Sequence, residues 1–211
     1  TEATETETTE GGEEAAPVTA EEEVDTSVVA ETEEAVYGGT VTIGLESEAT
    51  GLRPWEDSCS APCYNIMRSI FDPLMERTAE GTFEPFLAES LESNEDFTVW
   101  TMTLRPDIAF HDGTPLTAQT IADMFPLQQA GAAGSSAIAA SKLVSVTATD
   151  ELTVEYTLSG PFVAFPSFLS LAPLGFPFEP AAATADSAGF STAPIGTGPF
   201  TIASRDIDNE T

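Results

Sequence analysis

Residues 97–104, FTVWTMTL, most constrain the fold, because their apolar and polar side chains follow the alternation of a β-strand. Both faces of this strand are largely apolar or β-branched, so we expect it to lie inside a sheet. One face carries Phe97, Val99, Thr101 and Thr103, and the other carries Thr98, Trp100, Met102 and Leu104. The strand belongs to a longer patterned run, residues 87–118, which we expect to combine a helix, this strand and a tight turn.

Turn and capping residues follow the strand. Arg105-Pro106-Asp107 interrupts the extended pattern, and Asp112-Gly113 supplies residue types that tolerate left-handed backbone in a chain reversal. Thr117 is then placed to cap a helix over residues 118–125, and Pro126 is expected to end that helix.

The rest of the chain shows weaker local patterns. Apolar residues between 64 and 71 recur at helical spacing, whereas residues 144–149 and 152–158 alternate on either side of Asp150-Glu151 and predict a β-hairpin. A first strand is expected at 40–45 and a short helix in the Phe- and Pro-rich segment that begins at Gly160. The small residues at 131–141 predict a loose connector or, alternatively, a frayed helix end.

The N-terminal 36 residues differ sharply in composition from the remainder. They contain 13 acidic residues and no Lys or Arg. Such a segment buries too little apolar surface to offset the entropy of ordering it. We therefore expect residues 1–36 to be a disordered acidic linker and residues 37–211 to form the folded part.

Acidity extends over the whole protein, whose formal net charge is −30. Removing the 13 acidic residues of the first segment from the total of 36 leaves 23, against six basic residues. Binding to nucleic acid requires clustered Lys and Arg, and so does binding to an anionic membrane surface. Neither is expected as a partner.

Several motifs, in order along the chain, resemble the extracellular solute-binding proteins of family 5. They are GGTVTIGL at 38–45, IFDPLMER at 70–77, LAES at 87–90, the strand ending in LRP at 104–106, FHDGTPLTA at 110–118 and IGTGPF at 195–200. The succession is more specific than any single motif. The sequence departs from the family pattern at Gln119 and Thr120, where acidic residues are usual.

The resemblance implies an α/β fold that is lobe I of a two-lobed, type II periplasmic-binding-protein-like clamshell. Residues 37–211 then form an incomplete N-terminal lobe of a larger protein. The implied function is the substrate-binding component of an ABC importer, which captures a small solute and delivers it to permease subunits without chemistry. A di- or oligopeptide is the most common solute in the family, and nickel, haem-type and oligosaccharide ligands are the alternatives. No cofactor or metal is expected.

The resemblance also implies a location outside the cytoplasm, in the periplasm or at the outer face of the membrane. Residues 1–36 resemble the linker of a lipoprotein whose N-terminal lipid anchor is not in this chain, and the mechanism requires only a monomer. In an exported protein, the spacing of Cys59 and Cys63 favours a local disulfide; two free thiols at a helix start are the alternative.

The ligand-facing positions of the family resemble the loop after the first strand and the start of the next helix. These are Glu46, Trp55, Glu56, Ser58 and Tyr64. Trp55 and Tyr64 are able to stack on a ligand, and Glu56 is able to meet a cation. The alternative is that the aromatic rings pack on the core and the acids are solvated.

Two other function classes stay open from the residues alone. A secreted hydrolase would use paired carboxylates, and a cell-surface interaction module would account for the acidity. His111 beside Asp112 lies on a turn without a nucleophile in a recognisable frame, so we expect a structural histidine whose ring bonds to backbone.

Overall fold

The computed structural model describes residues 38–47 and 49–206, and the chain divides into two units, residues 1–42 and 43–211. The expected disordered linker, residues 1–36, lies outside the described residues. In the first unit, residues 38–42 are exposed and form no helix or strand. The strand predicted at 40–45 is wrong, since these residues have no regular structure and Val41 and Ile43 are 85% and 75% exposed. A strand is stable only when paired, and no described strand pairs with this segment.

A four-stranded antiparallel sheet forms the centre of the second unit. Its strand order is β3-β4-β6-β5, with β3 at Ala88–Ser93, β4 at Val99–Leu104, β5 at Leu143–Ala148 and β6 at Thr153–Leu158. The strand predicted from the alternating run is β4, and its interior position is confirmed by pairing with β3 and β6. Trp100 lies opposite Tyr156 and Met102 opposite Val154, which sets one apolar face across the two central strands.

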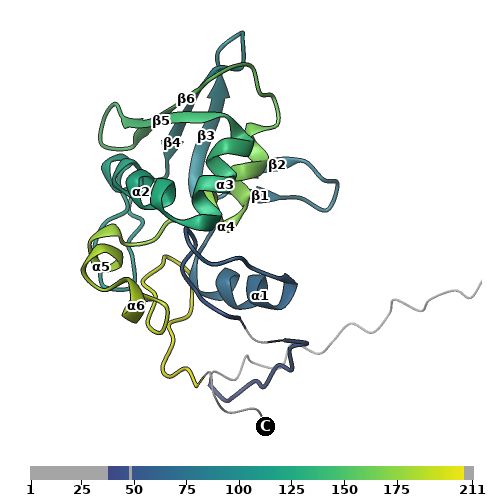
Figure 1. Ribbon diagram of the computed structural model, residues 1–211, viewed down its shortest axis with the longest axis vertical. Helices are drawn as coiled ribbons and strands as arrows, with labels where there is room; N and C mark the ends of the chain where they lie inside the picture. Colours follow the sequence, from purple (N-terminus) through teal and green to yellow (C-terminus); the bar gives the residue numbers. More distant parts are fainter. Residues whose placement is uncertain (1–37, 48, 207–211) are drawn as a thin grey trace, which may run out of the picture. The chain divides into compact units, whose positions relative to one another are not determined.

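Helices cover one face of this sheet, as Figure 1 shows for α2, Ala118–Ala130, and α3, Ala132–Ser141. Trp100, Met102 and Leu104 are buried, but Thr101 between them is exposed. The other face of β4, which carries Thr101, is therefore partly open to water, although the strand itself lies inside the sheet as predicted.

The capping pattern at the start of α2 is confirmed. Thr117 Oγ1 accepts a hydrogen bond from the Thr120 N–H at 3.2 Å, and Thr120 Oγ1 accepts one from the Thr117 N–H at 3.3 Å. This reciprocal pair is a capping box made with Thr in place of Glu, at a position where the sequence departs from the family pattern. Two neighbouring predictions are wrong, because the helix continues through the exposed Pro126 and the expected connector at 131–141 is α3. Proline removes one helical N–H, and the buried side chains of α2 outweigh that loss.

In each of the two hairpins of the sheet, one side-chain oxygen accepts hydrogen bonds from backbone N–H groups at the turn. The predicted hairpin is confirmed as β5 and β6, and Asp150 Oδ1 accepts from the N–H groups of Leu152 and Thr153. The helix expected in the run before the central strand is wrong, because residues 87–117 contain no helix. The residues before β4 form the strand β3 instead. There Asn94 Oδ1 accepts from the N–H groups of Thr98 and Val99, which closes a β3–β4 hairpin.

The remaining elements lie outside this sheet, and aromatic side chains fill much of the space between them. Phe71, Phe165, Phe176 and Phe178 are fully buried. These elements are α1 at Ala61–Ile70, β1 at Met75–Arg77 paired with β2 at Phe83–Pro85, the 3₁₀ helix η1 at Phe165–Ser170, α4 at Ala172–Gly175, α5 at Pro180–Ala185 and α6 at Ser187–Phe190. No helix among the described residues has the length and apolar character needed to cross a bilayer.

Candidate functional site

The loop that leads into α1 is anchored by Trp55. Its side chain is 4% exposed, and its ring lies 4.4 Å from the ring of Phe178 and 5.2 Å from that of Phe190, measured between centroids. The Trp55 carbonyl also accepts a hydrogen bond from the Gly134 N–H at 2.8 Å. Trp55 therefore fixes the loop to the body of the unit. This agrees with the alternative in which the aromatic ring packs on the core and does not face a ligand.

Three charged residues of the same loop, Arg53, Glu56 and Asp57, contact protein groups. Arg53 and Asp57 form a two-pronged ion pair, with Nη2–Oδ1 at 2.8 Å and Nε–Oδ2 at 3.0 Å. Its hydrogen bond with Asp57 raises the pKa of Arg53. Glu56 Oε2 accepts from the N–H of Ala132, the first residue of α3, at 3.2 Å. A carboxylate at a helix N-terminus satisfies an otherwise unpaired donor and meets the positive end of the helix dipole.

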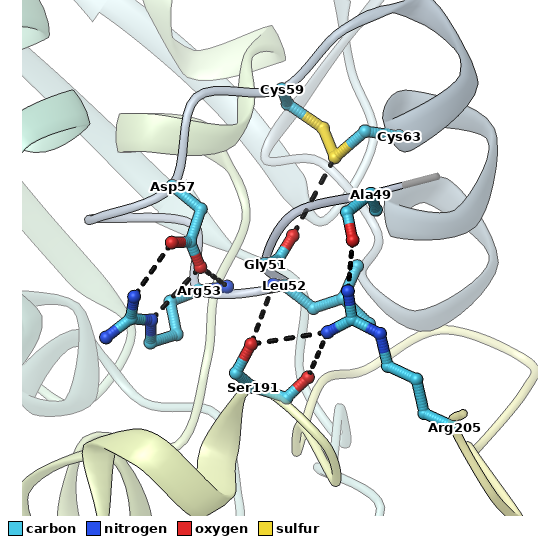
Figure 2. Close-up of a disulfide and its surroundings, with 9 residues drawn as sticks. All are labelled: Ala49, Gly51, Leu52, Arg53, Asp57, Cys59, Cys63, Ser191 and Arg205. Atoms are coloured by element: carbon cyan, nitrogen blue, oxygen red, sulfur yellow. Dashed lines mark hydrogen bonds and ion pairs between the residues drawn. A yellow bond between two sulfur atoms is a disulfide. The ribbon is translucent and has the colours of Figure 1, made fainter. Parts of the chain in front are cut away.

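A disulfide joins Cys59 and Cys63 across the start of α1, so the disulfide prediction is confirmed. Figure 2 shows this bond above the backbone of Gly51, whose carbonyl oxygen lies 3.9 Å from Cys63 Sγ. A disulfide sulfur carries no proton, so this is a van der Waals contact and not a donated hydrogen bond. The disulfide thus holds the entry to α1 against the loop at residue 51.

Arg205 ties a distant segment into the same place (Figure 2). Its guanidinium donates to the carbonyls of Ala49 and Ser191, the latter at 2.7 Å, and the Ser191 hydroxyl in turn accepts from the Leu52 N–H at 3.3 Å. One arginine thereby links backbone from three parts of the chain. Sequence reasoning missed this role, since nothing local to Arg205 indicates it.

A second distant link joins the HDG turn to the GTGPF segment. His111 Nδ1 accepts from the Gly196 N–H at 3.3 Å, so Nε2 carries the proton and donates to the Gly198 carbonyl at 2.8 Å. The prediction of a structural histidine whose ring bonds to backbone is confirmed. Gly198 N–H donates to the Ile70 carbonyl at 2.8 Å and Phe200 N–H to that of Ser69 at 3.0 Å, so the GTGPF segment also caps the C-terminal end of α1.

The glycines of this segment lie so close to the backbone of α1 that no larger residue fits at their positions. A Cβ at Gly196 would lie 2.3 Å from the Ile70 oxygen, and one at Gly198 would lie 2.6 Å from the Ile70 carbonyl carbon. The motif's glycines, read together with the histidine of HDG, are the sequence signal for this contact. The name α1 corner is used below for residues 49–72 together with His111 and the segment 191–205, which contact one another.

The five residues predicted to face a ligand fall into two groups. Trp55 and Glu56 are turned to protein partners, whereas Glu46 and Ser58 are exposed. Tyr64 is half-buried against Phe176, with ring centroids 6.2 Å apart, and burial raises the pKa of its phenol. One open hollow of about 350 Å³ occurs elsewhere, at α3 and β5, and none of the five lines it.

Similarity to known proteins places this chain in a family. Residues 82–211 match the model described as "Bacterial extracellular solute-binding proteins, family 5 Middle", and the chain belongs to this family. The α/β lobe fold expected from the sequence motifs is thereby confirmed.

Two relatives illustrate the sequence similarity. The nickel-binding periplasmic protein of Escherichia coli (strain K12) is 30% identical over 135 residues, which cover 63% of this chain and 26% of the relative. The periplasmic oligopeptide-binding protein OppA of Salmonella typhimurium is 35% identical over 137 residues, which cover 56% of this chain and 25% of the relative.

Solved structures share the fold. The Escherichia coli murein tripeptide binding protein MppA has a TM-score of 0.67 at 23% identity over 77% of this chain and 35% of its own. AgaA from A. tumefaciens R10, in complex with agropinic acid, has a TM-score of 0.65 at 27% identity over 76% of this chain and 32% of its own. The chain thus spans about a quarter to a third of the length of these proteins.

Proposed function

We propose that this chain is the N-terminal portion of a substrate-binding component of an ABC importer. It acts outside the cytoplasm and captures a small solute for delivery to permease subunits. The observation that carries the proposal is the family match over residues 82–211. A clamshell receptor works by closing two lobes around its ligand, and this chain supplies one wall of that site.

The α1 corner, together with Glu46 of the segment before it, is the proposed ligand-facing part of this wall. Glu46 and Ser58 are exposed and free of the packing that holds the rest of the loop, which supports direct contact with a solute. Trp55 and Glu56 support the same surface from behind, because their partners in the body fix the course of the loop. Tyr64, half-buried at the edge, is proposed as an aromatic border of the site.

A di- or oligopeptide is the proposed solute. Relatives named for oligopeptide and murein peptide binding share sequence with this chain, which supports that class. Nickel is the second candidate, because another relative is named for nickel binding. Within the described residues no group of three or more His, Cys, Asp or Glu side chains is placed to hold a metal ion, so a nickel site would draw on other residues.

The proposal includes a lipid anchor N-terminal to the acidic linker and a monomeric protein. A disordered linker of 36 residues, which is the arrangement proposed for residues 1–36, would span roughly 30–36 Å and so hold the receptor close to a membrane. Release of the protein from cells by a detergent wash, and not by salt, would agree with such an anchor.

Ligand screening of the complete protein tests the function. We expect di- or oligopeptides to raise the melting temperature, since a ligand at 100 times its dissociation constant stabilises by roughly 2.7 kcal/mol. Nickel salts and oligosaccharides are the comparison ligands. Formation of hydrolysis products, or the absence of stabilisation by any solute, would contradict the proposal.

Charge reversal then tests the proposed wall. Glu46→Arg and Ser58→Arg should weaken peptide binding, because both side chains are exposed on the loop. Glu80→Arg, an equally exposed charge reversal in the β1–β2 turn, is the matched control and should leave the affinity unchanged. Equal affinity in all three variants would remove both Glu46 and the α1 corner from the site.

A further inference from the structure

The chain contains a single histidine, His111, and its ring lies against the GTGPF segment. Both ring nitrogens are in use, since Nδ1 accepts from the Gly196 N–H and Nε2 donates to the Gly198 carbonyl. Only the neutral ring makes this pair of bonds, because a protonated imidazole carries a proton on both nitrogens and has no acceptor. The contact therefore depends on the protonation state of one side chain.

A second titratable side chain holds the residue between these two glycines. Asp72, which lies just beyond the end of α1, donates its backbone N–H to Thr197 Oγ1 at 3.3 Å. The Thr197 hydroxyl also bonds to the Asp72 carboxylate, and this carboxylate interacts electrostatically with the His111 ring. Residues 196–198 are thus bound by a histidine from the HDG turn and by an aspartate from the exit of α1.

The other charged residues of these elements have partners of their own. Arg68, the charged residue of α1, pairs with Glu76 at 2.9 Å. In the HDG turn, Asp112 is exposed and its carboxylate accepts from a backbone N–H of the same turn at 2.9 Å. Residues 195–200 carry no charged side chain. Among the described residues of these elements, Asp72 is therefore the charged group that acts on the ring.

A proton on the His111 ring would change its contacts. Nδ1 would become a donor and face the Gly196 N–H, which is also a donor, so this bond would be lost while Nε2 kept its acceptor. The Asp72 carboxylate favours the change, because a nearby negative charge stabilises a positive one. Imidazole side chains take up a proton between about pH 8 and pH 5, and the half-buried ring is within reach of water.

The segment would be loosened by this change and not detached. The His111 backbone N–H still donates to the Gly196 carbonyl at 2.9 Å, and two further backbone bonds join the segment to the end of α1. Protonation therefore removes one of several bonds, and it removes the one that a side chain can switch.

We propose that His111 and Asp72 form an acid-sensitive latch, which loosens the α1 corner as the pH falls and thereby lowers the affinity for solute. This inference rests on the proposed function, because the α1 corner is part of the proposed ligand-facing wall. The GTGPF segment caps the end of α1, and further along the chain Arg205 bonds to Ala49 and Ser191 beside the loop that enters α1. Loosening the segment weakens the support of both the helix and this loop.

Hydrogen exchange of the complete protein without solute, resolved to single amides, tests the latch itself. The protection factor of the Gly196 N–H should fall about ten-fold between pH 7 and pH 5, because its opening is linked to the uptake of one proton. Protection factors correct for the intrinsic pH dependence of exchange, and those of the β6 amides should stay unchanged.

Three variants identify the groups that titrate. His111→Gln keeps a side-chain acceptor and a donor but does not titrate, so the protection of Gly196 should not change with pH. Asp72→Asn removes the charge that favours the protonated ring, so the fall should begin at a lower pH. Asp150→Asn, the same substitution in the β5–β6 turn, is the matched control and should keep the wild-type onset.

The affinity for trialanine, a peptide without titrating side chains, tests the effect on solute. Measured by calorimetry on the complete protein, it should weaken from pH 7 to pH 5 by roughly five-fold or more, the lower end of ordinary coupling between two sites. In His111→Gln it should not change with pH.

The latch would be overturned by a Gly196 protection factor that stays constant from pH 7 to pH 5, or by one that falls as steeply in His111→Gln as in the wild type. A wild-type onset in Asp72→Asn would remove Asp72 from the latch. A constant affinity beside a falling protection factor would overturn the link to solute. Failure of the proposed function is distinguishable, because trialanine would then not bind at pH 7, whereas the exchange measurement requires no solute.

Discussion

The sheet and the α1 corner are held together in different ways. Around the sheet, β3–β4 and β5–β6 are hairpins closed within a few residues by Asn94 and Asp150. In the α1 corner, the hydrogen bonds that matter join residues far apart in the chain. His111 and Gly196 are separated by 85 positions, Leu52 and Ser191 by 139, and Ala49 and Arg205 by 156.

This difference predicts which substitutions should destabilise the molecule most. Local hairpins close small loops and re-form readily, whereas contacts between distant segments carry a larger loop-closure cost. A single lost contact in the α1 corner should therefore release a whole segment, while a lost turn contact near the sheet should stay local. The predictions below test this contrast, from the largest expected effect to the smallest.

Substituting the glycines of the GTGPF segment should have the largest effect. Gly196→Ala or Gly198→Ala places a Cβ against the backbone of Ile70, which has no room to retreat without shifting α1. We expect a loss of about 3 kcal/mol in the free energy of unfolding, at the upper end of ordinary overpacking. Urea denaturation of the complete protein measures the loss, and hydrogen exchange should show residues 195–200 released.

Gly160→Ala is the matched control for this prediction. Gly160 follows β6 on the sheet side, and a Cβ there would meet nothing within 4 Å. The control should keep wild-type stability. A wild-type exchange pattern at residues 195–200 in the Gly196 and Gly198 variants would contradict the proposed tight docking on α1.

Reduction of the Cys59–Cys63 disulfide should have the next largest effect. The closed loop is short, and the chain-entropy model gives about 2 kcal/mol for a loop of this size. The melting temperature should fall by roughly 4–8 °C in dithiothreitol. The double variant Cys59→Ser, Cys63→Ala should melt at the temperature of the reduced wild type, and dithiothreitol should not change its melting temperature. If reduction left the melting temperature of the wild type unchanged, the loop would be held by its other contacts alone.

The sheet side of this contrast could be predicted in part from the sequence, since its signals are local. Period-2 alternation located β4, β5 and β6, and Thr117 marked the start of α2. The errors there are also local. The role of Asn94 as a turn acceptor is not evident from its neighbours, and without it β3 is not predicted. A proline usually ends a helix, but the exposed position of Pro126 lets α2 continue.

The α1 corner could be predicted only through motifs. The spacing of two cysteines predicted the disulfide, and His111 was expected to bond to backbone, but nothing local shows that the partner is Gly196. Arg205 was missed for the same reason. For the candidate site, the motifs predict which loop is involved but not the orientation of Trp55 and Glu56, because their partners lie in α3, α6 and the segment before α5.

Removing the imidazole should have an intermediate effect. His111→Ala leaves the Gly196 N–H and the Gly198 carbonyl without their ring partners, and we expect a loss of about 1–2 kcal/mol. Thr117→Ala on the sheet side removes the α2 cap and should cost about 1 kcal/mol. The readout that separates them is hydrogen exchange at residues 195–200, which should rise in the first variant only. Equal exchange in both variants would remove the contrast between the two regions.

The smallest expected effect concerns two carboxyl groups, Asp72 and Asp150, whose pKa values are shifted in opposite directions. Burial raises the pKa of Asp72 in the α1 corner, while nearby His111 and the Thr197 hydroxyl partly oppose this rise. Hydrogen bonds from Leu152 and Thr153 lower the pKa of the exposed Asp150 in the β5–β6 turn. A raised native pKa favours the protonated form, so the contribution of Asp72 is present at low pH and is lost as the pH rises through its native pKa. The contribution of Asp150 is present above its unfolded pKa and is lost as the pH falls through its native pKa.

The amide variants should therefore diverge between pH 3 and pH 7. Asp72→Asn removes a group that ionises at a desolvation cost, so relative to the wild type it should gain stability as the pH rises, by a few tenths of a kcal/mol after allowance for solvent screening. Asp150→Asn should instead lose stability relative to the wild type over the same range, because the wild-type carboxylate becomes the better acceptor for its turn. Urea midpoints of the two variants and the wild type across this range measure both slopes. If both variants changed with pH in the same direction, the environments of the two carboxyl groups would not differ as the contacts at the α1 corner and the sheet turn require.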